Sequence, residues 1–330
     1  ARHAVELTLK FSNDRLIQAG VVKDDGRKLN HNIRSYWNHL HVSAIGDEKL
    51  SKTISSLEPY IDSLSQIDND GQELRYHRNR EDDPSLGNYA IANLKLIRGS
   101  LHDLQKLLTA LKYRTLEFID ERITGSFTNR CSRSDLMAIA QLLPQRDAWA
   151  NDAFDEIKAR VKERFGLSNK QFCIALDQIQ ESREMRAILG VESPLLHLSD
   201  DEVIYVIERW RLGHPKRERE RETLDYFDPA RFDAMKEWSK YCKEGVGAIE
   251  AYLSPEALAD LEAMFYLYRD RIYSELYERM VAETLKKHRA AKDPTAQILH
   301  LMEKTNLLEC IQGAATKLGR PSLTNRLAEL

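Results

Sequence analysis

The chain has 330 residues, of which 42% are hydrophobic and 31% charged, and its formal net charge is −3 at pH 7. This length exceeds the usual size of one domain, so we expect two domains, or one core with a large helical extension. Only 14 Gly and 9 Pro argue against an all-β fold, and the charge argues against a uniformly basic nucleic-acid surface, although it allows a local basic site.

Apolar residues recur every three or four positions along almost the whole chain, which is the spacing of one face of an α-helix. The first helix is expected to be under way where the sequence begins, because Val5, Leu9 and Leu16 share a face and no N-cap residue precedes them. We therefore expect a further segment before Ala1. The fold class expected is all-α, with an N-terminal helical bundle and a larger C-terminal helical domain.

Arg34 and His39 form an Arg-x4-His motif, and His41 extends it to Arg-x6-His. RNA can be cut without a metal ion when its own 2′-hydroxyl attacks the neighbouring phosphate. A histidine can move protons at neutral pH, and an arginine can hold the phosphate. On an ideal helix, however, the first two side chains lie about 140° apart. The alternative is that Trp37 and Leu40 face the core while Arg34 and His39 are surface groups.

A basic cluster follows a turn-rich segment and contains Arg75, Tyr76, His77, Arg78 and Arg80. Its arginines could bind successive phosphates while the tyrosine stacks on a base, and His77 is a second candidate for proton transfer. The alternative is that Tyr76 fixes a loop to the core and the arginines pair with the acidic residues at positions 81–83.

A long helix is expected from about Leu86 to Ile123. It carries Arg98 and His102 on one face, four residues apart, so His102 is a further catalytic candidate in a composite site. The helix ends at a break around Gly125. We place the domain boundary there and expect domains at residues 1–124 and 125–330.

In the C-terminal part, Ser168, Ser199 and Ser254 are expected to cap the starts of helices. The apolar stripe from Leu258 to Met280 predicts one helix of roughly ten turns. A run at residues 216–222 alternates in charge and indicates a solvated linker rather than a phosphate-binding strip, so we expect an internal break near residues 213–229.

Four cysteines lie far apart, and none belongs to a Cys-x-x-Cys or Cys/His cluster, which is typical of unpaired thiols in a reducing cytoplasm. No apolar run approaches the ~18 residues that cross a bilayer. No phosphate-binding loop, dinucleotide fingerprint or zinc-ligand spacing is present. We therefore expect a cytoplasmic protein with no membrane segment, no cofactor and no metal site.

The order of elements in the first third of the chain resembles bacterial members of the HEPN superfamily. The residues that carry the resemblance are the helix around Ala4–Lys10, the helical start at residues 29–33 and the turn-rich segment at residues 67–77. His31-Asn32-Ile33 takes the place of a His-Asp-Leu-like segment, and Leu74-Arg75-Tyr76-His77 that of a Phe-Arg-Tyr-Pro-like element. RNA-cleaving members of this superfamily carry an Arg-x4–6-His motif on a helix, which is what the pattern of Arg34, His39 and His41 resembles. The alignment of the other segments, however, puts Arg34 and His39 outside the family's catalytic pair.

The resemblance implies a HEPN-like domain over roughly residues 1–122 and leaves two functions open. In the first, the protein is an RNA- or nucleotide-binding effector, as a metal-independent ribonuclease of a prokaryotic toxin–antitoxin or antiviral defence system. In the second, it is a non-catalytic helical scaffold that binds a protein partner. We expect a homo-oligomer, because HEPN-like domains commonly build their site across a dimer and the stripe from Leu258 to Met280 offers a second seam.

Overall fold

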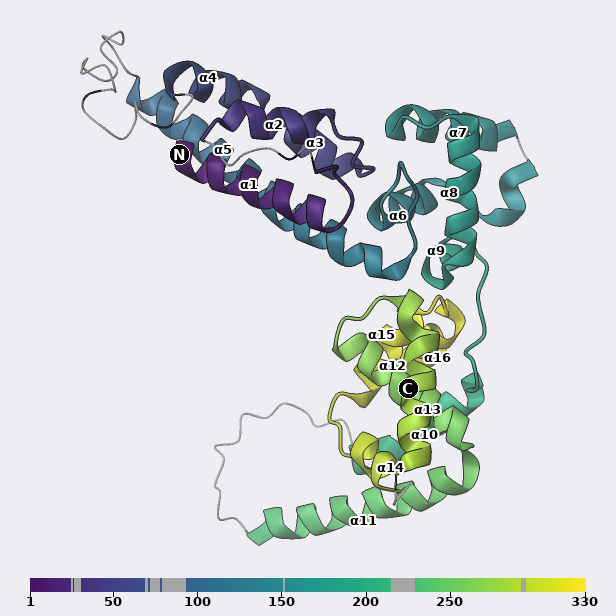
Figure 1. Ribbon diagram of the computed structural model, residues 1–330. Coiled ribbons are helices and arrows are strands. Elements are labelled where there is room, and N and C mark those ends of the chain that lie inside the picture. The colour runs from purple at the N-terminus through teal and green to yellow at the C-terminus, as the bar shows by residue number, and fades with distance from the viewer. Residues whose placement is uncertain are drawn as a thin grey trace. The chain divides into compact units, whose positions relative to one another are not determined.

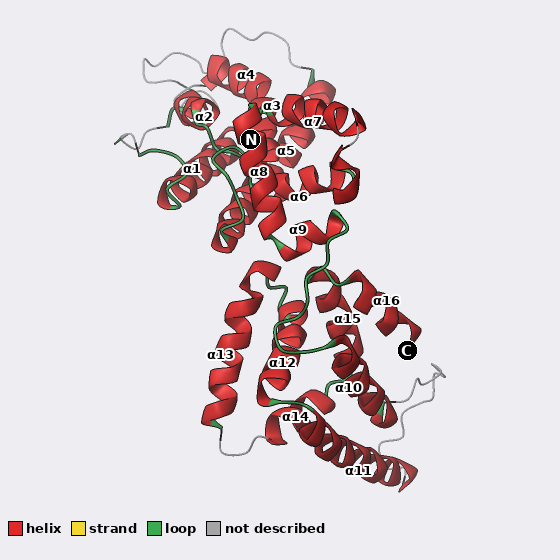
Figure 2. Cartoon of the chain, turned by 90° about the vertical axis from the view of Figure 1, so that its right-hand side faces the viewer, coloured by secondary structure: helices red, strands yellow, loops and turns green. Residues whose placement is uncertain are grey.

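The computed structural model of the protein describes residues 1–24, 26, 31–68, 71, 78, 93–150, 152–214, 229–291 and 295–330. The secondary structure of these residues consists of helices with no strands, so the all-α prediction is confirmed (Figures 1 and 2). None of the helices within these ranges is long and apolar enough to cross a membrane. The chain divides into two compact units, the first comprising Ala1–Leu143 with Asn151–Ile179 and the second Pro144–Ala150 with Gln180–Leu330.

The expected domain boundary between residues 124 and 125 falls within the first unit. The chain does turn there, because Gly125 has a φ of 72° directly after the short 3₁₀ segment Arg122–Thr124. A division of the chain between residues 124 and 125 therefore stays a prediction. The second expected break, near residues 213–229, falls largely on residues outside the described part of the chain.

The first unit is a bundle whose helices are α1 (Arg2–Gln18), α2 (Ile33–Val42), α3 (Glu48–Ser56), α4 (Glu58–Asp68), α5 (Leu94–Glu121), α6 (Arg133–Leu142), α7 (Asp152–Phe165) and α8 (Asn169–Glu181). The long helix α5 packs against α1 and α3, and α2 packs on α1 (Figure 1). Leu9, Leu50 and Leu111 are fully buried along this seam. Each such side chain contributes about 2 kcal/mol, so packing rather than helix propensity holds these short helices.

Arg114 of α5 lies at the centre of a buried polar network that joins α3, α5 and α6. Its Nη2 donates to Oδ2 of Asp47 at 2.5 Å, and its Nη1 donates to Oε1 of Glu121 at 2.6 Å. Asp47 is also the N-cap of α3, where it accepts the N–H of Leu50 at 2.6 Å. The arginine is 3% exposed, so removing either carboxylate would leave buried N–H donors of the guanidinium without an acceptor.

Asp135 connects the same network to the start of α6. It forms a capping box with Ser132, and its Oδ2 also accepts the N–H of Glu48, the first residue of α3, at 3.0 Å. One carboxylate therefore satisfies backbone donors at the starts of two helices.

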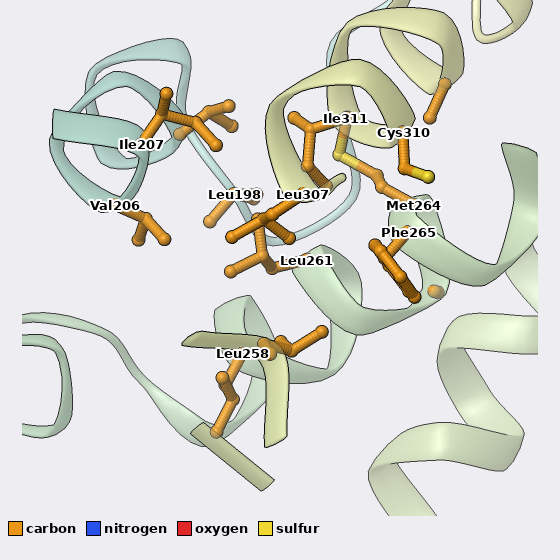
Figure 3. Packing of buried hydrophobic residues seen from close by; sticks show 14 of the residues in the cluster. Leu198, Val206, Ile207, Leu258, Leu261, Met264, Phe265, Leu307, Cys310 and Ile311 are labelled. Atoms are coloured by element: carbon orange, nitrogen blue, oxygen red, sulfur yellow. The ribbon is translucent and has the colours of Figure 1, made fainter. Parts of the chain in front are cut away.

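The helices of the second unit are α9 (Arg183–Ile188), α10 (Asp200–Gly213), α11 (Pro229–Tyr252), α12 (Pro255–Arg269), α13 (Tyr277–Ala290), α14 (Thr295–Met302), α15 (Leu307–Lys317) and α16 (Pro321–Glu329). At its centre, α12 packs against α13 and α15. Figure 3 shows Leu261 and Phe265 of α12 in the same buried cluster as Leu307 and Ile311 of α15. The helix starts expected at Ser168, Ser199 and Ser254 are confirmed by their side-chain hydrogen bonds.

The prediction of one long helix over residues 258–280 is wrong, because α12 ends at Arg269 and α13 begins at Tyr277. The N–H of Ile272 donates to the carbonyl of Leu267, and the N–H of Arg271 donates to that of Tyr268. This is a Schellman turn, which requires a left-handed residue at its C′ position. Here that residue is Arg271, with a φ of 56°, the one non-glycine residue with positive φ among those described.

Replacing Arg271 by glycine is expected to raise the free energy of unfolding by roughly 0.5–1 kcal/mol. A residue with a Cβ atom is strained in the left-handed region, and glycine removes this strain from the folded protein. Part of the gain is lost because glycine also raises the conformational entropy of the unfolded chain. Urea denaturation followed by circular dichroism measures the change. The matched control is Gly20→Ala, in the equivalent turn after α1, where a Cβ would meet nothing within 4 Å. The free energy of unfolding of that variant should fall by about 1 kcal/mol. If the free energies of unfolding of both variants changed in the same direction, this explanation would be contradicted.

Asp135→Asn is expected to stabilise the protein at pH 8 and to flatten the pH dependence of its stability. Burial, followed by the charge of Asp47, raises the pKa of Asp135 from 3.8 to about 7. The folded protein thus holds this proton more tightly than the unfolded chain, so the stability it contributes is complete below about pH 4 and is lost as the pH rises through 7. Melting temperatures between pH 5 and 8 test this, and identical profiles for both proteins would refute it.

Candidate active site

The side chains of Arg34 and His39 leave α2 toward different partners. Arg34 forms an ion pair with Asp62 of α4. The Nδ1 of His39 lies 2.7 Å from the amide oxygen of Asn13 on α1, and its Nε2 lies 3.1 Å from the carbonyl oxygen of Lys23. The structure therefore does not bring the two residues of the Arg-x4-His motif together around one group.

The remaining sequence candidates are dispersed. His102 is exposed on α5 and lines a groove against α3. Arg78 is exposed as well. The other members of the basic cluster lie outside the described residues, namely Arg75, Tyr76, His77 and Arg80. Their roles stay predictions.

A different histidine is held by a buried carboxylate. Glu6 of α1 is 2% exposed. Its Oε1 accepts a hydrogen bond from Nζ of Lys10 at 2.7 Å and lies 2.9 Å from Nδ1 of His31. Its Oε2 accepts from the guanidinium of Arg2. Three basic side chains therefore surround one carboxylate at the start of the bundle.

Arg2 brings together the chain just before α2 and the end of α4. It is 4% exposed, and its Nε donates to the carbonyl of Asp68, the last residue of α4, at 3.1 Å. Its Nη2 donates to the carbonyl of His31. Gly71, with a φ of 84°, packs so closely on the guanidinium that a Cβ there would lie 3.0 Å from Nη1. One buried side chain thus fixes the start of α2 next to the end of α4.

The charge of Glu6 determines which ring nitrogen of His31 donates the hydrogen bond between them. Burial alone would raise the pKa of Glu6, but the hydrogen bonds from Lys10, His31 and Arg2 together lower it to about 2. An ionised carboxylate only accepts hydrogen bonds, so Nδ1 of His31 must donate to it. The lone pair of the neutral ring then lies on Nε2, and the side chain is 56% exposed. This arrangement orients a histidine as a proton acceptor.

Sequence reasoning missed Glu6 and Arg2 because the contacts that tie them to the rest of the bundle, with His31 and Asp68, join residues 25 or more positions apart. A signal was present in α1. Arg2, Glu6 and Asn13 fall on the same helical stripe as Leu9 and Leu16, so polar residues occupy positions that should face the core. Charged residues at such positions are buried only when they are paired.

No protein-family model matches this chain, and no curated protein or solved structure matches it either. Within the described ranges, no group of three or more His, Cys, Asp or Glu side chains is placed to hold a metal ion. A function for this site is therefore inferred from the chemistry of its own residues.

Glu6→Gln is expected to lower the free energy of unfolding at pH 7 by about 3 kcal/mol, because the buried Arg2 loses the nearer of its two carboxylate partners and keeps only Asp68, whose Oδ2 lies 3.9 Å from its Nε. The folded pKa of Glu6 lies below its ordinary value of 4.5. The stability it contributes is therefore present above pH 4.5 and lost as the pH falls toward 2, so the difference between the two proteins should shrink on acidification. The control is Glu283→Gln, whose exposed pair with Arg279 should matter little. Equal effects of both substitutions would contradict this.

Proposed function

We propose that the first unit binds RNA and cleaves it without a metal ion, with His31 as the residue that accepts the proton. The observation that supports this most strongly is the pairing of an ionised, buried Glu6 with Nδ1 of a half-exposed histidine. Such a pairing fixes the ring and leaves Nε2 facing outward. A structural histidine more often has both ring nitrogens engaged, as the partly exposed His39 does within the same bundle.

In the proposed reaction, Nε2 of His31 takes the proton of a ribose 2′-hydroxyl. The 2′-oxygen forms a bond to the adjacent phosphorus while the bond from phosphorus to the 5′-oxygen breaks. The leaving oxygen takes a proton from water, and the hydroxide that remains takes the proton from His31. The products are a 2′,3′-cyclic phosphate and a 5′-hydroxyl. The positive charge gained by the imidazole is stabilised by Glu6, which already accepts its Nδ1–H.

Binding of the RNA backbone is assigned to neighbouring cations. Nζ of Lys10 shares Oε1 of Glu6 with His31, so an ammonium lies beside the imidazole. The chain that passes Arg2 at Gly71 leads into the basic cluster, of which Arg78 is described and exposed. The HEPN resemblance supports the wider proposal of a homo-oligomeric effector in a prokaryotic toxin–antitoxin or antiviral defence system.

The alternative function is that of a scaffold for a protein partner, and one observation favours it. The first two turns of α5 expose large apolar side chains, with Leu94 at 76%, Leu96 at 68% and Ile97 at 44% exposure. Contiguous apolar surface of this kind is typical of protein interaction sites. This hypothesis predicts no RNA cleavage.

The test is incubation of the protein with labelled single-stranded RNA in EDTA. We expect cleavage that ends in a 2′,3′-cyclic phosphate, and a fall of at least about 100-fold in rate for His31→Ala. His39→Ala is the matched control, since that ring is already engaged by Asn13 and Lys23, and its rate should stay close to that of the wild type. Arg78→Ala should reduce the log–log salt slope of RNA binding by about 0.7.

Two results would overturn the proposal. If the protein neither binds nor cuts RNA, the scaffold function stands. If His31→Ala cuts as fast as the wild type while remaining folded, the proton acceptor is another residue, and His102→Ala and His77→Ala then distinguish the remaining candidates.

A further inference from the structure

The apolar stripe that α5 buries in the bundle continues into its first turns, where it lies exposed. The buried members of the stripe are Leu104, Leu108 and Leu111. The same spacing of three or four positions continues toward the start of the helix through Leu94, Ile97 and Leu101, which are 76%, 44% and 43% exposed. Every residue from 93 to 103 is exposed. The first turns of α5 therefore carry a core-like apolar face that lies in water.

A basic stripe runs beside this apolar face, about 40–120° around the helix from Leu94. Its members recur every three or four positions and are Lys95, Arg98, His102 and Lys106. Lys95 and Arg98 are exposed and form no ion pair with a described residue. Asp103 is the one acidic residue between positions 93 and 116, and its carboxylate lies 3.4 Å from Nζ of Lys106. The positive charge at Lys95 and Arg98 is therefore not matched along α5.

An apolar face beside a basic stripe is typical of a helix that lies at a membrane surface. Such a helix places its apolar side chains at the boundary of the acyl chains, and its Lys and Arg side chains meet the phosphates of anionic headgroups. The long stems of these basic side chains keep their charged ends in the headgroup layer. None of the described helices, α5 included, is long and apolar enough to cross a membrane, so the pattern indicates contact with the surface alone.

The position of Leu96 favours a lipid surface over a groove on a protein partner. Its side chain is 68% exposed and lies about 160° around the helix from Leu94. A protein groove accepts one face of a helix, so it would cover either Leu94 or Leu96 and leave the other in water. Lipid molecules can pack around a helix on more than one side, and they can therefore take both side chains out of water.

We infer that the first turns of α5 bind an anionic lipid surface. Leu94, Leu96 and Ile97 lie at the boundary of the acyl chains, and Lys95 and Arg98 contact the headgroup phosphates. The occupant of this apolar surface is thus lipid rather than the protein partner of the scaffold function. The surface shares no residue with the site around Glu6 and His31, so its binding is independent of the proposed RNA cleavage.

Flotation of the full chain with unilamellar vesicles tests the inference. Vesicles of phosphatidylcholine with about one-third phosphatidylglycerol should bind the protein at least about tenfold more strongly than phosphatidylcholine alone, because Lys and Arg gain only from an anionic surface. Binding should weaken as NaCl rises from about 50 to 500 mM. Lys95→Gln with Arg98→Gln, and separately Leu94→Gln with Ile97→Gln, should each weaken binding to the anionic vesicles at least about tenfold.

The matched control is Ile174→Gln on α8, because Ile174 is 43% exposed and Ile97 is 44% exposed. This variant should bind the anionic vesicles as the wild type does. All the substituted side chains are exposed, so circular dichroism should show the same helix content in every variant.

Three results would overturn the inference. The first is no binding to the anionic vesicles, which would leave the apolar surface to the protein partner of the scaffold function. The second is equal binding to both kinds of vesicle, and the third is undiminished binding by the variant of Leu94 and Ile97. His31→Ala should bind vesicles as the wild type does, and the variant of Leu94 and Ile97 should cleave RNA at the wild-type rate. Failure here is therefore distinct from failure of the ribonuclease proposal.

Discussion

A guanidinium group taken out of water needs acceptors for five N–H donors and negative charge for its cation, and this demand organises the first unit. Arg114 meets it with Asp47 and Glu121. Because Asp47 also caps α3, the charge balance of one side chain on α5 fixes where α3 begins.

Arg2 has the same role at the other end of the bundle. Its partners are the carboxylates of Glu6 on its own helix and of Asp68, and the carbonyls of His31 and Asp68. The buried Arg2, whose role is structural, thereby holds the exposed His31 next to the buried Glu6. Stability and the proposed chemistry are coupled here, since Glu6 both neutralises Arg2 and orients His31.

What could be predicted from the sequence was local. Serine caps at Ser168 and Ser199 depend on residues three positions apart, so their helix starts were predictable. The break after α12 was not, because apolar spacing continues through it and Arg271 is not a residue that usually adopts a left-handed backbone. The site around Glu6 depends on partners from α1, from α4 and from His31 just before α2, and spacing along the chain does not contain that information. The Arg-x4-His motif shows the opposite case. Its residues have the expected spacing along the chain, but the side chains of Arg34 and His39 contact different neighbours.

The Schellman turn after α12 also changes the entropy of assembling the second unit. Had the stripe from Leu258 to Met280 stayed one rod, its apolar face would have had to find partners distant in sequence. Because the chain reverses near Arg271, α12 packs against α13 across a connection of seven residues, Asp270 to Leu276. Closing so short a loop costs little conformational entropy, and contacts near in sequence favour rapid folding. The helical hairpin can therefore form first and present α12 as a template on which α15 docks.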